Sequence, residues 1–143
     1  MNLQKRKVPN NRFWENKKVL ITGHTGFKGS WLSFWLIKLG ANIVGVSKDI
    51  PTNPSLFESL ELKKKIKHYQ FDLVSQEKIR DVIKDEKPDF IFHLAAQALV
   101  SVSYENSIET IMSNTIGTTN LLEGCLLYTS DAADEGLGVD LGG

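Results

Sequence analysis

The sequence has one cysteine, Cys125, so it can form no disulfide within the chain and no cysteine-rich metal centre. It also has no apolar run as long as a membrane span and no signal-peptide pattern. The basic run near the start of the sequence, Lys5-Arg6-Lys7, is interpreted as part of a solvated arm over residues 1–17, with nucleic-acid binding as a minor alternative. These absences predict a cytoplasmic protein that binds no metal, no nucleic acid and no membrane.

A glycine-rich segment, Gly23–Gly29, carries the strongest signal. It follows an apolar stretch, Lys18–Thr22, that reads as a buried strand, and it precedes an apparent helix over residues 30–39. The first glycine permits a tight turn, the second lets a pyrophosphate approach the backbone, and the third lets the helix pack on the strand. The helix N-terminus directs unpaired N–H groups at the anion. The alternative is a tight turn that binds no ligand.

The rest of the chain alternates between strand and helix patterns, which predicts an α/β fold with a parallel sheet. The predicted strands are Lys18–Thr22, Asn42–Val46, Ile66–Phe71 and Phe90–Leu94. The predicted helices after the first are Ser55–Leu62, Gln76–Asp85 and Ile108–Glu123. We expect the strand order 3-2-1-4, with the first and fourth strands most buried. The aromatic residues Trp31, Phe34 and Trp35 are expected in the core.

Several segments resemble one known family. They are the Gly23–Gly29 loop, Asp72-Leu73, His93–Gln97 and Ser113–Thr118, within a match over about residues 12–124. They resemble the extended short-chain dehydrogenase/reductase family, which includes nucleotide-sugar epimerases and dehydratases. Within this family, Lys28 and the segment Pro51–Glu58 most resemble the corresponding residues of dehydratases that act on CDP-glucose.

The resemblance implies a Rossmann-type, doubly wound parallel sheet, here truncated after about four strands. It implies NAD as a retained cofactor, CDP-glucose as the nucleotide-sugar substrate, and a homodimer formed through the helix over residues 108–123. The chemistry would be a 4,6-dehydration that yields a 4-keto-6-deoxy sugar for surface polysaccharide. The alternatives are another nucleotide-sugar epimerase or dehydratase, or a non-catalytic dinucleotide-binding sensor or scaffold.

The resemblance also implies which residues contact the cofactor. They are Gly23, Thr25, Gly26, Phe27, Lys28, Gly29, Ser47, Asp72, Leu73, Leu94, Ala95, Ala96 and Ser113. Asp72 has an alternative role as a cap near the Ser75 helix, and His93 is interpreted as a satisfied core histidine. One position departs from the family pattern. Ser47 stands where relatives usually have an acid for the ribose, and Asp49 follows two residues later.

The family's catalytic Tyr-x-x-x-Lys is missing, because Tyr69, Tyr104 and Tyr128 are each followed four residues later by an apolar residue. No catalytic residue is therefore assigned, and the chain by itself is expected to be inactive. We divide it into the arm over 1–17, a partial NAD-binding domain over 18–124, and a tail over 125–143. The tail can be written in codons that resemble a DNA sequencing adapter, so we expect it to be non-native.

Overall fold

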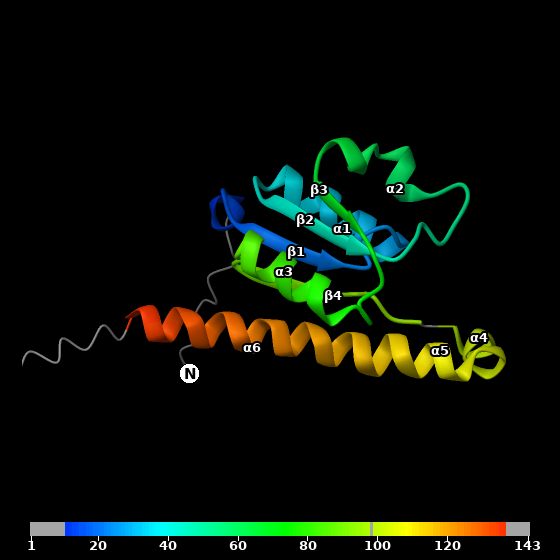
Figure 1. Cartoon of the computed structure of the whole chain (residues 1–143). Helices are drawn as coiled ribbons and strands as arrows, with labels where there is room; N and C mark the ends of the chain where they lie inside the picture. The colour runs from blue at the N-terminus through cyan, green and yellow to red at the C-terminus, as the bar shows by residue number, and fades with distance from the viewer. Residues whose placement is uncertain (1–10, 98, 137–143) are drawn as a thin grey trace, which may run out of the picture.

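The computed structural model describes residues 11–97 and 99–136, and its centre is a four-stranded sheet (Figure 1). The strands are β1 (Lys18–Thr22), β2 (Asn42–Ser47), β3 (Lys67–Gln70) and β4 (Phe90–His93). Their order is β3-β2-β1-β4, and every pairing is parallel. The predicted fold class, strand order and strand direction are confirmed.

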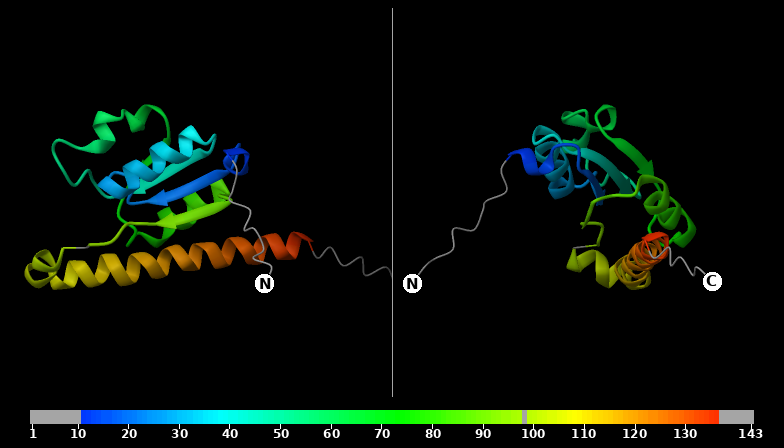
Figure 2. Two further views of the ribbon diagram at one scale, coloured as in Figure 1. Left: turned by 180° about the vertical axis from the view of Figure 1, so that it is seen from behind. Right: turned by 90° about the vertical axis from the view of Figure 1, so that its left-hand side faces the viewer.

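Helices cover both faces of this sheet, as expected for a doubly wound fold (Figure 2). The longer ones are α1 (Phe27–Lys38), α3 (Gln76–Glu86) and α6 (Gly117–Gly136). The shorter ones are η1 (Asn11–Trp14), α2 (Leu56–Ser59), η2 (Leu62–Lys64), α4 (Val100–Glu105), α5 (Ser107–Ile111) and the π-helical turn η3 (Met112–Ile116). Among the described residues, no helix combines the length and the apolar character needed to cross a membrane.

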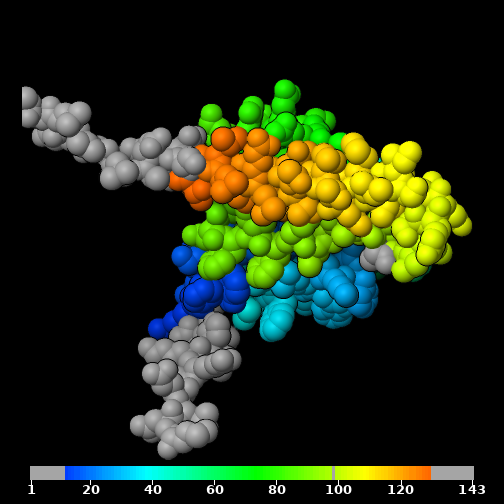
Figure 3. All heavy atoms as spheres, turned by 90° about the horizontal axis from the view of Figure 1, so that it is seen from below, coloured from blue at the N-terminus to red at the C-terminus, as the bar shows by residue number. Residues whose placement is uncertain are grey.

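Alternate residues of the central strands build two core layers, because successive side chains of a strand point to opposite faces. Leu20, Val44 and Val46 pack with residues of α3 and with Leu121 of α6. On the other face, neighbouring residues of β1 and β2 pack with Leu36 of α1. Figure 3 views the molecule from below and shows α6 lying along the underside, beside α3. The sheet is therefore held between α1 and the pair formed by α3 and α6.

Two predictions about burial were wrong. β4 is only half-buried along its length, while β1 and β2 are the buried pair, because β4 lies at an edge of the sheet. On α1, Trp31 and Trp35 are 49% and 65% exposed, and Phe34 is half-buried. The small residues of this helix, including Gly29 and Ser33, face the sheet instead and let the helix pack closely.

The last predicted helix also differs from the prediction. It runs from α5 through η3 into α6 and ends at Gly136, not at Glu123. Residues 125–135 contain no glycine or proline, so nothing in that segment stops a helix. The helix therefore continues through residues that we predicted to be a separate tail. Residues 137–143, and residues 1–10 of the predicted arm, lie outside the described residues. The rest of that arm is not solvated throughout, because Trp14 of η1 packs against Phe90 and Phe92 of β4. The short helix α4 lies between β4 and the last helix, where no helix was predicted.

One buried carboxylate ties three elements together. Glu86, at the end of α3, accepts a hydrogen bond from Tyr69 of β3 at 2.6 Å. It also forms ion pairs with Lys67 of β3 and Lys18 of β1. Burial alone would raise its pKa, but the contacts with Lys67, Tyr69 and Lys18 together lower that pKa below its usual value. Glu86 is therefore a charged residue with a structural role.

Candidate functional site

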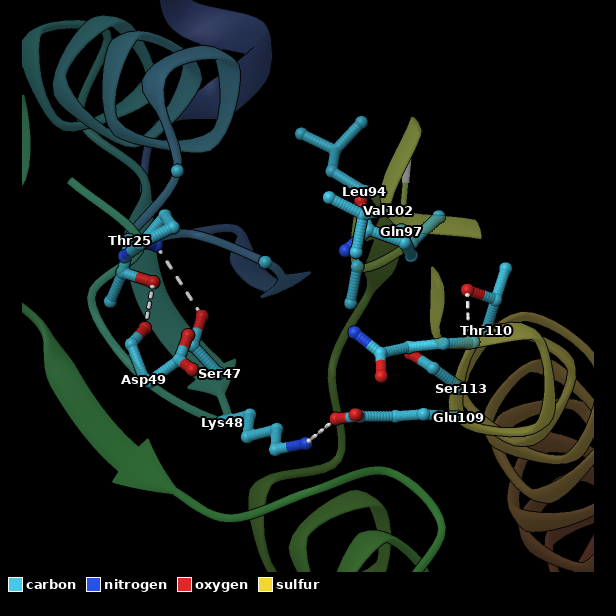
Figure 4. A pocket seen from close by; sticks show the side chains of 16 residues that line it. Thr25, Ser47, Lys48, Asp49, Leu94, Gln97, Val102, Glu109, Thr110 and Ser113 are labelled. Carbon is cyan, nitrogen blue, oxygen red and sulfur yellow. Dashed lines mark hydrogen bonds and ion pairs between the residues drawn. The ribbon is translucent and has the colours of Figure 1, made fainter. Parts of the chain in front are cut away.

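A cavity of about 450 Å³ opens where β1, β2 and β4 end. Ligands of open parallel sheets bind at this position, outside the carboxyl ends of the strands. Figure 4 shows its two sides: Thr25, Ser47 and Asp49 come from the β1 and β2 ends. The other side has Gln97 from the segment after β4 and helical residues that include Ser113. The cavity thus lies between the sheet and the α4–η3 helices.

The glycine loop presents an uncapped helix end to this cavity. Gly26 is the N-cap of α1, and no side chain there accepts from the first turn. The first N–H groups of a helix have no acceptor within the helix, so those of Phe27 and Lys28 are free to bind an anion. A Cβ added to Gly26 would meet only the carbonyl oxygen of Gly23, at an ordinary 3.4 Å. The protein's own packing therefore does not require glycine here, and the space beside it fits a ligand phosphate.

The other two glycines of the loop are required by the chain itself. Gly23 has φ +72°, and a Cβ there would lie 2.7 Å from the backbone nitrogen of Ala95. A Cβ on Gly29 would lie 2.2 Å from the carbonyl oxygen of Gly23. Gly23 thus lets the bend after β4 approach the loop, and Gly29 lets α1 begin directly over it. This division of roles agrees with the three predicted glycine functions.

A hydrogen-bond chain holds the bend after β4. Thr22 Oγ1 accepts from the backbone N–H groups of Leu94 and Ala95 at 3.2 and 3.3 Å. It lies 2.6 Å from His93 Nδ1, and His93 Nε2 lies 2.8 Å from Thr118 of α6. Burial lowers the pKa of His93, so the ring is neutral at pH 7 and is interpreted as accepting from Thr22 and donating to Thr118. The expected satisfied histidine is confirmed, and it links the cavity wall to α6.

The end of β2 forms the opposite wall. Ser47 is 5% exposed, and the Thr25 N–H donates to its Oγ over 3.4 Å. The Thr25 hydroxyl donates to the backbone carbonyl of Asp49 at 2.6 Å. His24, which is fully buried, lies behind Ser47 with Nδ1 3.0 Å from the serine oxygen. The loop and the second strand are therefore joined by side-chain hydrogen bonds at the cavity.

Lys48 connects the two sides of the cavity. Its ammonium lies 2.6 Å from Glu109 of α5 (Figure 4). It also lies 3.3 Å from Asp72, which follows β3. The Glu109 contact, and then the Asp72 contact, raise the pKa of Lys48 above its ordinary value. Sequence reasoning missed Lys48 and Glu109, because they come from segments 61 residues apart and no motif relates them.

The structure brings together most of the predicted cofactor residues. Those that line the cavity are Gly23, Thr25, Gly26, Ser47, Leu94, Ala95, Ala96 and Ser113. Phe27 and Lys28 are exposed at the start of α1, beside the cavity. Asp72 and Leu73 lie outside it. Asp72 accepts from the Val74 N–H at 3.1 Å, which agrees with its alternative role near the helix start, and Leu73 is buried in the α3 core layer.

The π-helical turn η3 positions two polar residues that face the bend. Ser113 lines the cavity, and Asn114 exchanges two hydrogen bonds with the backbone of Gln97, at 2.7 and 3.1 Å. Such turns are frequent at functional sites. The sequence predicted a regular helix here, since a π turn has no sequence signature. Among the described residues, no three His, Cys, Asp or Glu side chains are grouped as a metal centre.

Comparison with known proteins now identifies the family. The sequence profile described as GDP-mannose 4,6 dehydratase matches residues 20–133, which is most of the chain. The chain belongs to this family. Proteins that resemble it include CDP-glucose 4,6-dehydratase of Salmonella typhimurium, 50% identical over 111 residues. That match covers 78% of this chain and 31% of the relative. Protein CapI of Staphylococcus aureus is 40% identical over 110 residues, 74% of this chain and 33% of the relative.

Solved structures agree with this family assignment. UDP-glucose 4-epimerase of Thermus thermophilus, solved in complex with NAD, matches with a TM-score of 0.70 and 28% identity. The Thermotoga maritima UDP-glucose 4-epimerase, solved with UDP-glucose, also has a TM-score of 0.70 and 28% identity. Each match covers 78% of this chain and 34% of the solved chain. The chain thus spans about a third of the length of the relatives it matches.

Proposed function

We propose that the full-length protein is an NAD-dependent nucleotide-sugar 4,6-dehydratase that acts on CDP-glucose in the cytoplasm. The observation that carries this proposal is the 50% identity to CDP-glucose 4,6-dehydratase over 111 residues. The cavity at the strand ends and the open space beside Gly26 support it, because they fit a dinucleotide pyrophosphate. The product would be CDP-4-keto-6-deoxyglucose, formed with the loss of one water.

NAD, when bound, would supply the reversible oxidation, accepting a hydride from C4 of the sugar and returning it to C6 after water is lost across C5–C6. The residues of this chain would hold the cofactor. The N–H groups at the start of α1 would bind the pyrophosphate, and Ser47 would face the adenosine ribose. The small residues Ala95 and Ala96 would let the dinucleotide lie against the bend. This sequence contains no Tyr-x-x-x-Lys, so we assign none of its residues to proton transfer.

The first prediction is that the 143-residue chain binds NAD at one site but gives no turnover with CDP-glucose. Isothermal titration calorimetry measures the binding, and mass spectrometry of the nucleotide sugar detects the loss of a water molecule. The full-length protein should convert CDP-glucose faster than dTDP-glucose or GDP-mannose. A preference for another nucleotide sugar would favour a different epimerase or dehydratase. NAD binding by the full-length protein without any turnover would favour a sensor or scaffold.

We further propose that the full-length protein is a homodimer formed through α5, η3 and the first turns of α6. Support comes from a row of exposed apolar side chains on these helices. Ile108, Ile111 and Met112 are 78%, 60% and 40% exposed, and Ile116 is 37% exposed. Soluble proteins rarely leave such a contiguous apolar surface uncovered.

The second prediction concerns this interface. In the full-length protein, Ile111→Asp should weaken dimerisation about thirtyfold, because it introduces a charge into an apolar contact worth about 2 kcal/mol. Sedimentation equilibrium measures the change. Trp35→Asp is the matched control, because Trp35 is equally apolar and 65% exposed but lies on α1. If the dimer dissociates with Trp35→Asp and persists with Ile111→Asp, the interface lies on α1 instead.

A further inference from the structure

Ser47 occupies a position with a known role in dinucleotide sites. In βαβ dinucleotide-binding units, an acidic residue near the end of the second strand accepts a hydrogen bond from the adenosine ribose. Here the strand ends at a serine whose hydroxyl lines the cavity. A hydroxyl can donate or accept, so its behaviour toward a ligand depends on its other hydrogen bonds.

Two histidines control those hydrogen bonds. Ser47 Oγ lies 3.0 Å from His24 Nδ1, and His24 Nε2 lies 2.8 Å from His68 Nδ1. The three side chains come from β2, the glycine loop and β3, and they form one continuous chain. It runs from the cavity wall to the half-buried His68. Among the described residues, no other side chain forms a hydrogen bond with the His24 ring.

The His24 ring has no freedom to turn away from this chain. It is fully buried and lies over Gly45, where an added Cβ would come within 2.5 Å of the ring. β3 pairs His68 with Gly45, which brings the second imidazole alongside. Phe57 packs edge-on at 5.3 Å between ring centroids. The packing therefore fixes both nitrogens of His24 in their present directions.

The location of the His24 proton follows from the groups around the ring. Burial lowers the pKa of His24 to about 4. The contact with the Val46 carbonyl acts in the opposite direction, and the charge of His68 adds to the lowering. The ring is therefore neutral at pH 7. The nearby Val46 carbonyl favours an N–H on the ring, and Nε2 faces His68 instead. We therefore assign the proton to Nδ1. Ser47 Oγ then accepts from both Nδ1–H and the Thr25 N–H, which leaves its own hydroxyl hydrogen free.

We propose that His24 and His68 are positioning residues that make Ser47 a hydrogen-bond donor to a hydroxyl of the adenosine ribose. This inference rests on the proposed NAD site and goes beyond it. In this arrangement His68 Nδ1–H donates to His24 Nε2, His24 Nδ1–H donates to Ser47, and Ser47 O–H donates into the cavity. The end of β2 thus binds ribose through a neutral donor, where an acid would act as an acceptor.

The binding test uses ADP and 2′,3′-dideoxy-ADP with the whole chain, measured by calorimetry. His68→Leu removes the nitrogen that fixes His24, so it should weaken ADP binding about fivefold, the effect of one neutral hydrogen bond. It should leave dideoxy-ADP binding unchanged, because that ligand has no ribose hydroxyl. His68→Asn keeps a polar atom near the Nδ1 position and should restore ADP affinity. An equal loss for both ligands would mean only a structural role and would overturn the proposal.

A second measurement needs no ligand. Two-bond ¹H–¹⁵N correlation spectra distinguish a protonated from an unprotonated ring nitrogen, and the proposal requires a proton on His24 Nδ1 and none on Nε2. A proton on Nε2 would overturn the proposal even if NAD binds. If the spectra show Nδ1–H but neither NAD nor ADP binds to wild type, the proposed NAD function fails instead. The two failures are therefore distinguishable.

Discussion

Gly29→Ala is expected to destabilise the protein by about 3 kcal/mol, at the upper end of overpacking effects. The new Cβ would lie 2.2 Å from the carbonyl oxygen of Gly23 and 2.6 Å from the Cα of His24. Both contacts are with backbone, so no side-chain rotation can relieve them. Either α1 must move off the sheet or the loop must open. Urea unfolding monitored by circular dichroism measures the loss.

Gly26→Ala should weaken NAD binding and leave stability nearly unchanged. Gly26 has φ −71° and ψ 167°, which any residue adopts, and its added Cβ makes one ordinary contact. Stability should change by less than about 1 kcal/mol, because alanine is compatible with this backbone. NAD affinity should nevertheless fall more than about a hundredfold, because the Cβ enters the space proposed for the pyrophosphate. Gly26→Val should abolish binding. Unchanged NAD affinity in folded Gly26→Ala would mean that the loop is only a turn.

Stability should also fall steeply as the pH is lowered below about 6.5. All three histidines of the chain, His24, His68 and His93, have lowered pKa values in the folded state, chiefly through burial. Between about pH 4 and 6.5 the unfolded chain therefore binds protons that the folded chain does not, and protonation favours unfolding. With a folded pKa of about 4, His24 alone should account for about 2 kcal/mol lost by about pH 5.

Urea unfolding from about pH 7.5 down to about pH 5 tests this effect. Over that range the lowered pKa of Glu86 adds little, because its contribution is lost only below the ordinary glutamate pKa. His24→Gln cannot titrate, so its stability should depend less on pH even if its absolute stability is lower. A wild-type stability that is constant from about pH 7.5 to 5 would contradict the assignment of a buried, neutral His24.

The strands of this protein could be predicted from sequence because their signals are local. β1 has its predicted bounds, Lys18–Thr22, and the other three strands differ by only one or two residues. Their order followed from the alternation of strand and helix together with the rules for parallel sheets. The three glycine roles also came from sequence, because each depends on neighbouring backbone.

The errors concern features set by the complete three-dimensional context. Trp31 and Trp35 are apolar residues on a helix, and only the position of α1 on the sheet shows that they face outward. The contacts of His24 with Ser47 and His68 depend on strand register, and so does the ion pair of Lys48 with Glu109. α6 extends to Gly136 because residues 125–135 contain no helix-breaking glycine or proline, whereas the sequence prediction ended the helix at Glu123.

The strand order has a consequence for how the molecule can be made. β2 pairs with β1, β3 with β2, and β4 with β1, so each strand after β1 joins a partner that precedes it in the chain. After β1, no strand needs a strand that the ribosome has yet to make. Once Gln70 has emerged, three paired strands and the Gly23–Gly29 loop can form. The bend at 94–96, and with it the second wall of the cavity, is added only afterwards. Translation can therefore build the phosphate-binding side of the site before the side that encloses it.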